Sequence, residues 1–209
     1  MNTSKTQFTL GKKGGWPTSL STVFATTALL SACSLITPPE APRETYDLSV
    51  PDGLTENRRG AGSQILVKVP TALKSIDSER IIVRPSPSVI TYLQGAQWGD
   101  TVPRLVQAKL VEAFENTGSS GATAKPGDGL VIDYQLVSDI RRFEILNQVA
   151  TIEISIKLLA DRTGLVRETR IFESRVRAGG QSAEDYVAAF NAAFGRIAKD
   201  IVSWVRSRT

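Results

Sequence analysis

Histidine is absent from this sequence of 209 residues, and cysteine occurs only once. Without histidine the chain cannot form a Ser-His-Asp or Cys-His catalytic group, and it lacks the commonest metal ligand of proteins. A carboxylate pair or a Ser-Lys dyad would remain for catalysis, but no spacing singles one out. The glycine-rich stretch 118–129 lacks the P-loop pattern, in which Gly-Lys precedes Ser or Thr. We therefore expect no enzyme, no metal site and no cofactor.

The single cysteine, Cys33, closes the run Leu30-Ser31-Ala32-Cys33, after an apolar stretch and before a proline-rich segment. This arrangement resembles a bacterial lipobox, in which the thiol receives a diacylglycerol and the chain is cut before the cysteine. We predict lipidation of Cys33 and signal cleavage after Ala32. With its only cysteine modified, the domain cannot form an internal disulfide, so packing must stabilise it.

The apolar run 20–30 is too short to cross a membrane. As a helix it would rise about 16 Å, far less than the roughly 30 Å hydrocarbon core of a bilayer. Lys5, Lys12 and Lys13 precede this run without any acidic residue. A positive segment, a short apolar segment and small residues before Cys33 together predict a signal peptide over 1–32. The alternative is a short buried helix that ends in a core cysteine.

The chain has little excess charge of either sign once this segment is removed. The full sequence has 25 basic and 21 acidic residues, and residues 1–32 contain three lysines and no acid, which leaves 22 basic and 21 acidic residues. No basic stripe with interleaved aromatic residues remains, so we expect no nucleic-acid partner. The remaining length, 33–209, suits one domain with a substantial core.

A proline-rich tether is predicted over 33–45, before a single globular domain over 46–209. Pro38, Pro39 and Pro42 favour extended polyproline geometry, which gives residues 34–45 a reach of about 37 Å. Ser34 and Leu35 include no aspartate, the usual inner-membrane retention signal after the lipidated cysteine in enteric bacteria. By that analogy we expect the outer membrane as the destination, with the domain in the periplasm.

The first half of the domain is predicted to contain short strands and one helix. Strands are expected at 46–50, 64–69, 80–84 and 88–93. Pro85-Ser86-Pro87 predicts a turn or an edge, because proline cannot donate to a sheet ladder. From Val102 to Phe114 the apolar period is that of a helix, with Asp100 or Thr101 as its N-cap. The stretch 118–129 is expected to be a loop.

Three longer strands and a final helix are predicted in the second half. Strands are expected at 130–140, 150–158 and 165–176, and the alternation in the second places isoleucines on one face and polar residues on a wet face. Ser182 and Asp185 predict a capping box at the start of an amphipathic helix that packs on the sheet. The expected fold is α+β, a mostly antiparallel sheet packed with two main helices in an α/β sandwich.

Several short motifs follow the lipobox in a recognisable order. They are Tyr46-Asp47-Leu48, Ile81-Ile82-Val83-Arg84, Ile90-Thr91-Tyr92-Leu93, a link ending in Ala96-Gln97-Trp98, and a helix beginning Val102-Pro103-Arg104-Leu105-Val106. In this order they resemble the ABC-type transport auxiliary lipoproteins. The resemblance extends through the three longer strands and the final helix.

This resemblance implies a location and partners. Members of the family accompany MCE-domain proteins and their ABC transporters, which move phospholipids, sterols or other hydrophobic molecules between the inner and outer membranes. The chain would then be a non-catalytic lipoprotein, anchored to the outer membrane on its periplasmic face. It would dock the MCE assembly or help to pass lipid cargo onward.

Two aromatic residues, Tyr92 and Trp98, flank the link before the first helix and are candidates for partner contact, because interface cores favour aromatics. Packing in the domain's own core is the alternative for both. Two other functions remain open. One is a structural or assembly lipoprotein, such as a pilotin-like factor of an outer-membrane machine. The other is a periplasmic hydrolase, which would require a pocket lined by two carboxylates with displaced pKa values.

Overall fold

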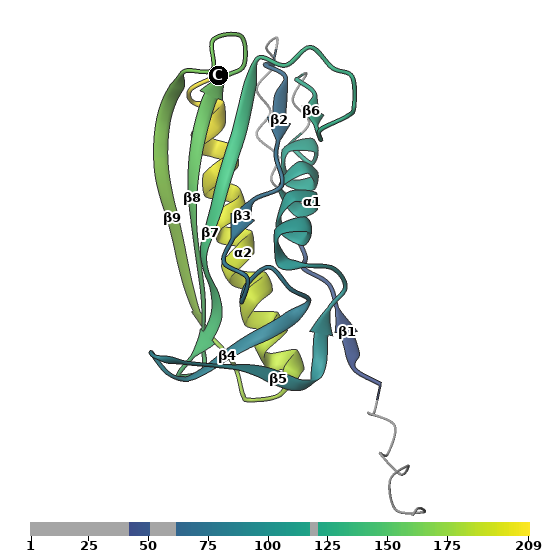
Figure 1. Ribbon diagram of the computed structural model, residues 1–209, viewed down its shortest axis with the longest axis vertical. Helices are drawn as coiled ribbons and strands as arrows, with labels where there is room; N and C mark the ends of the chain where they lie inside the picture. Colours follow the sequence, from purple (N-terminus) through teal and green to yellow (C-terminus); the bar gives the residue numbers. More distant parts are fainter. Residues whose placement is uncertain (1–41, 51–61, 118–120) are drawn as a thin grey trace, which may run out of the picture. The chain divides into compact units, whose positions relative to one another are not determined.

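The computed structural model describes residues 42–50, 62–117 and 121–209 (Figure 1). These residues form nine strands and two helices. In chain order the elements are β1 (Glu44–Tyr46), β2 (Ile65–Val67), β3 (Thr71–Ala72), β4 (Arg80–Ser86), β5 (Val89–Trp98), α1 (Val102–Glu115), β6 (Thr123–Ala124), β7 (Tyr134–Leu146), β8 (Val149–Ala160), β9 (Val166–Arg177) and α2 (Ala183–Arg206). The predicted signal peptide 1–32, Cys33 and residues 34–41 of the predicted tether lie outside the described residues.

The sheet is organised around β7, which has strands on both of its edges. One edge pairs with β8 along its length, and β8 pairs with β9, both antiparallel. The other edge pairs in succession with β2, β3 and the middle of β4, all parallel. The sheet is mostly antiparallel, as expected from the sequence, but it is mixed because it also includes these parallel pairs. The parallel pairing of β2 and β3 was not predicted, because strands of two or three residues carry no readable period.

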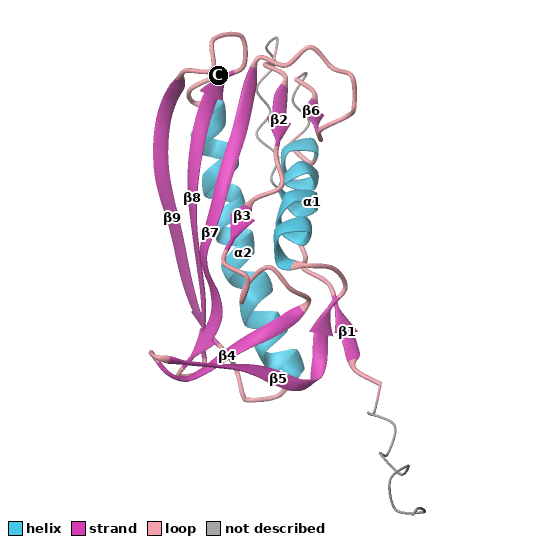
Figure 2. Ribbon diagram, viewed as in Figure 1, coloured by secondary structure: helices cyan, strands magenta, loops and turns pink. Residues whose placement is uncertain are grey.

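Both helices and the sheet enclose one apolar core (Figure 2). The isoleucines of β8 lie on the face that α2 covers, where Ile152, Ile154 and Ile156 are fully buried. The apolar stripe of α2 packs on them, and Phe190, Phe194 and the rest of the predicted stripe are buried. The helix-on-sheet packing predicted from the 3.6-residue period is thus confirmed.

The two helices begin as the sequence indicates. Thr101 is the N-cap of α1, in extended geometry and without a side-chain capping bond, and Pro103 lies in the first turn. At α2 the backbone N–H of Asp185 donates to Ser182 Oγ at 3.2 Å, and the backbone N–H of Ser182 donates to Asp185 Oδ2 at 3.1 Å. This reciprocal pair is the predicted capping box.

Several strand boundaries differ from the predictions. The first strand is β1 at Glu44–Tyr46, not 46–50, because its parallel partner in β5 ends at Trp98. The strand expected from residue 130 begins at Tyr134, which pairs with the last residue of β8, Ala160, so earlier residues have no strand partner. A register shift between Ile140 and Arg142 then exchanges the two faces of β7, so that the other set of alternate residues is buried after the shift. The expected loop 118–129 includes the short strand β6.

Candidate functional site

The chain joins the sheet through β1, which adds to the edge of β5. Tyr46 pairs in register with Trp98, and its carbonyl accepts a hydrogen bond from the N–H of Gly99 at 2.8 Å. Its hydroxyl donates to Glu44 Oε2 at 2.5 Å and to Glu184 Oε1 at 3.2 Å. The hydrogen bond to Glu44, with a smaller one to Glu184, raises the pKa of Tyr46 well above its ordinary value. The segment that follows the tether is therefore fixed to the start of α2.

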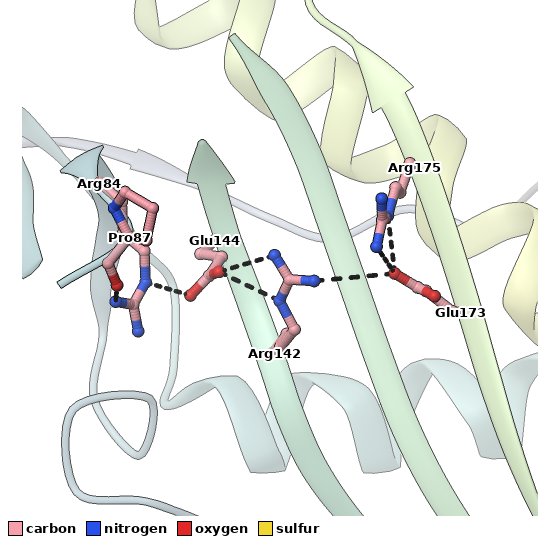
Figure 3. A network of polar contacts seen from close by, with 6 residues as sticks. All are labelled: Arg84, Pro87, Arg142, Glu144, Glu173 and Arg175. Carbon is pink, nitrogen blue, oxygen red and sulfur yellow. Dashed lines mark hydrogen bonds and ion pairs between the residues drawn. The ribbon is translucent and has the colours of Figure 1, made fainter. Parts of the chain in front are cut away.

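The sheet face that α2 does not cover carries a network of ion pairs between strands (Figure 3). Glu144 lies between two guanidiniums: its Oε2 is 2.5 Å from Arg84 Nε, and its Oε1 is 3.1 Å from an Arg142 nitrogen. Glu173 lies between Arg142 at 3.7 Å and Arg175 at 2.6 Å. Each carboxylate is compensated by two cations, so the network joins β4, β7 and β9 as a structural element.

An open groove of about 900 Å³ lies at the start of β7 and the end of β8, at the end of the long strands away from Glu144. We call this region the distal end: residues 130–134, 160–167 and 207–209, where the β8–β9 turn and the C-terminus lie together (Figure 1). Four large apolar side chains are exposed here, and Val131 is 81% exposed. The four are Leu130, Val131, Leu165 and Val166.

The charged residues of the groove divide into two groups. Asp133 Oδ2 accepts the backbone N–H of Gln64 at 2.8 Å, and Asp161 Oδ1 accepts Nε2 of Gln135 at 2.5 Å. Both carboxylates therefore hold the start of β7 in place. Arg162 and Arg167 also line the groove, and neither is in an ion pair with any described residue. Two accessible guanidiniums beside exposed apolar groups can bind a partner, and guanidiniums are not suited to acid–base catalysis.

The C-terminal end of α2 is fastened to the sheet beside this groove. Arg208 Nε donates to Glu168 Oε2 at 2.7 Å, and Trp204 Nε1 donates to Glu168 Oε1 at 3.1 Å. Hydrogen bonding from Arg208 first, and then from Trp204, lowers the pKa of Glu168 below its ordinary value. These contacts hold the C-terminal end of α2 against β9.

The two aromatic candidates for partner contact lie in different environments. Trp98 is 1% exposed, and its ring centroid is 5.5 Å from Phe190 and 5.8 Å from Phe143. It therefore occupies the core, as the alternative interpretation expected. Tyr92 is half-buried, and the Arg80 guanidinium lies 3.8 Å from its ring centroid. Tyr92 remains accessible in part.

Two carboxylates of the long strands, Asp139 and Glu153, each have a polar partner of their own. Asp139 accepts a hydrogen bond from Thr71 Oγ1 at 2.8 Å, and Glu153 pairs with Arg141 at 3.5 Å. Among the described residues, no group of three or more acidic or cysteine side chains could hold a metal ion. Within the same ranges, neither helix has the length and apolarity needed to cross a bilayer.

The exposed apolar residues were missed by the sequence analysis. The predicted strands 130–140 and 165–176 begin at Leu130 and Leu165. Both lie instead in loops at the strand ends and are exposed. The sequence does contain a signal for these loops. The pairs Leu130–Val131 and Leu165–Val166 directly follow glycines, which mark turns, and two adjacent apolar residues do not show the apolar-polar alternation of a strand.

Comparison with known proteins identifies the chain. The family model of the ABC-type transport auxiliary lipoprotein component matches residues 46–202. The chain belongs to this family. The crystal structure of XCC0632 from Xanthomonas campestris, of the family model DUF330, is similar with a TM-score of 0.70 and 29% identity, over 79% of this chain and 99% of that chain.

Two further relatives are more limited in what they add. A crystal structure of an uncharacterized protein has a TM-score of 0.64 at 12% identity, over 78% of this chain and 99% of that one, and supports the fold alone. The protein bll6063 of Bradyrhizobium diazoefficiens, also described as uncharacterized, is 34% identical over 169 residues. That alignment covers 78% of this chain, which spans 45% of the relative's length.

The family confirms the resemblance seen in the ordered motifs. Its members are lipoproteins, so the chain is an envelope protein held at a membrane, and the family is described as an auxiliary component of ABC-type transport. An auxiliary component supports a transporter instead of carrying its catalytic step.

Proposed function

We propose that the protein is an outer-membrane lipoprotein that supports an MCE-type lipid transport system by contact. Its acylated Cys33 would hold the domain at the periplasmic face, and the MCE-domain protein and ABC transporter would supply the conduit and the ATPase. The observation that carries this proposal is the family match over 46–202, which covers almost the whole described domain. Ser34 and Leu35 after the cysteine support outer-membrane sorting.

The distal end supplies a surface for the proposed contact. Leu130, Val131, Leu165 and Val166 present exposed apolar area, and Arg162 and Arg167 add cationic groups at its rim. Interfaces of this type have an apolar centre with arginine enriched around it. The contacts of Glu168 with Trp204 and Arg208 hold the C-terminal end of α2 on β9 beside this surface, so that part need not become ordered on binding.

A crosslinked pull-down of the mature protein from native membranes tests the proposal. Bound proteins would be identified by mass spectrometry after stringent washing. We expect an MCE-domain protein and ABC transporter subunits. Recovery of only secretin or pilus subunits would overturn the proposal in favour of an assembly lipoprotein, and an intact leader with an unmodified Cys33 thiol would remove its anchoring step.

A further inference from the structure

The hairpin formed by β4 and β5 ends in an exposed apolar tip at residues 85–90. Val89 and Ile90 are exposed large apolar side chains, and Pro85 and Pro87 are also exposed. The polar groups of the turn are partly satisfied from within, because Arg84 donates to the carbonyl of Pro87 at 2.8 Å. Transfer of this turn from water into a bilayer surface therefore costs less desolvation free energy than transfer of a turn whose carbonyls have no hydrogen bond.

This tip is held rigidly on the domain. Val83 of β4 pairs with Ile145 of β7, and Arg84 Nε binds the buried Glu144 at 2.5 Å. Thr91 Oγ1 donates to the carbonyl of Val83 at 2.8 Å across the hairpin. Because these contacts order the hairpin already, insertion of the tip into another phase loses little conformational entropy.

Tyr92 adds a side chain suited to a membrane interface. It is half-buried, and the Arg80 guanidinium stacks on its ring at 3.8 Å. Tyrosine concentrates where apolar and aqueous phases meet, and arginine keeps its charge in water while its stem covers apolar surface. The hairpin thus combines an apolar tip with an aromatic and cationic base.

The tether brings this end of the domain towards the bilayer. β1 enters beside β5, at the same end of the long strands as the hairpin and opposite the distal end (Figure 1). The chain from Cys33 to Pro42 can extend at most about 32 Å. β7 alone, with 13 residues, spans about 43 Å between the two ends. An anchor at Cys33 is therefore too short to allow an upright domain with its distal end on the membrane, and an upright domain must have its hairpin end towards the bilayer.

We propose that residues 85–90 insert Val89 and Ile90 into the bilayer surface, as a second membrane contact beside the acyl chain. The contact is apolar and requires no anionic lipid. The contact would orient the domain, so that the distal end lies away from the membrane and is accessible to a partner. This inference rests on the proposed anchoring of Cys33.

The experiment uses the full lipidated chain in phosphatidylcholine vesicles with brominated acyl chains. An environment-sensitive fluorophore is attached at Ser88→Cys, in the hairpin turn, or at Thr163→Cys, in the turn between β8 and β9. Both positions are exposed hairpin turns, at opposite ends of the long strands, so they are matched controls. Acylation of Cys33 leaves the introduced thiol as the only reactive one.

We expect brominated lipid to quench the label at residue 88 at least threefold more than the label at residue 163. Equal and weak quenching at both positions, on protein that floats with the vesicles, would refute the membrane contact while leaving the anchor intact. Stronger quenching at residue 163 would reverse the orientation. Protein that does not float at all would refute the anchor, and with it this inference.

A pair of double variants separates insertion from proximity. Val89→Asp with Ile90→Asp should abolish the quenching at residue 88 while flotation persists through Cys33. Leu165→Asp with Val166→Asp, which places the same charges at exposed positions of the distal end, should leave that quenching unchanged. Unchanged far-UV circular dichroism checks that both variants fold. Persistent quenching in the first variant would contradict insertion of the tip.

Discussion

Replacement of Glu144 by Gln should destabilise the domain far more than the same replacement at Glu173. The side chain of Glu144 is 6% exposed and that of Glu173 is 39% exposed, although each lies between two arginines of one network (Figure 3). Without its carboxylate, Glu144→Gln leaves the guanidiniums of Arg84 and Arg142 facing each other. The two variants thus differ in burial but not in chemistry.

The magnitudes follow from that difference. Breaking a fully buried ion pair costs about 3–5 kcal/mol. Arg84 and Arg142 retain 22% and 29% exposure and can recover part of their hydration, so we expect a loss of about 2–3 kcal/mol for Glu144→Gln. For Glu173→Gln the exposed pairs predict a loss below about 1 kcal/mol.

Urea unfolding of residues 34–209, followed by tryptophan fluorescence, measures both losses. The slope of the unfolding free energy with urea should be unchanged, so that the midpoints report stability directly. In about 1 M NaCl the loss at Glu173 should vanish, while that at Glu144 should persist, because salt screens exposed pairs more than buried ones. Equal losses for the two variants would refute the reasoning from burial.

Three other predictions concern the anchor and the two ends of α2. Cys33→Ser should release the protein from the membrane fraction, or leave it unprocessed, while the circular dichroism of the domain is unchanged; fractionation checks this. Ser182→Ala should lower the free energy of unfolding, measured with urea, by about 1 kcal/mol, because it removes the side-chain acceptor of the capping box. Since folding lowers the pKa of Glu168, its stabilising effect is present above the ordinary glutamate pKa and is lost as pH falls through the lowered value. When the stability of the domain is measured as the pH is lowered, Glu168→Gln should lack this contribution to the pH dependence. A stability profile identical to that of the unmodified protein would contradict the prediction.

The sequence predicted the long strands and both helices, but it did not predict how the short strands pair. Residues 150–158 and the stripe of α2 repeat often enough to define a buried face, and both lie in the core as expected. The parallel strands β2 and β3 are too short for a period, and their pairing with β7 depends on contacts distant in sequence. The switch of parity after Ile140 also depends on the partner strand, since β8 fixes the register.

The candidate surfaces were less predictable than the fold. The predicted strands 130–140 and 165–176 include Leu130 and Leu165, and apolar side chains in strands are normally buried. Whether a strand continues to such a residue depends on the length of its partner, and the local sequence does not contain that length. Trp98 shows the converse, because a large aromatic residue is compatible with either a core or an interface until its neighbours are known.

Site-specific photocrosslinking at Val131 tests the central claim most directly. A photoreactive side chain at this exposed position of the distal end is compared in living cells with one at Ile171, which is exposed in the middle of β9. The account predicts an adduct with an MCE-domain protein at Val131 and at most a weak one at Ile171. No adduct with that protein at Val131, in cells where it is present and the lipoprotein is anchored, would contradict the account.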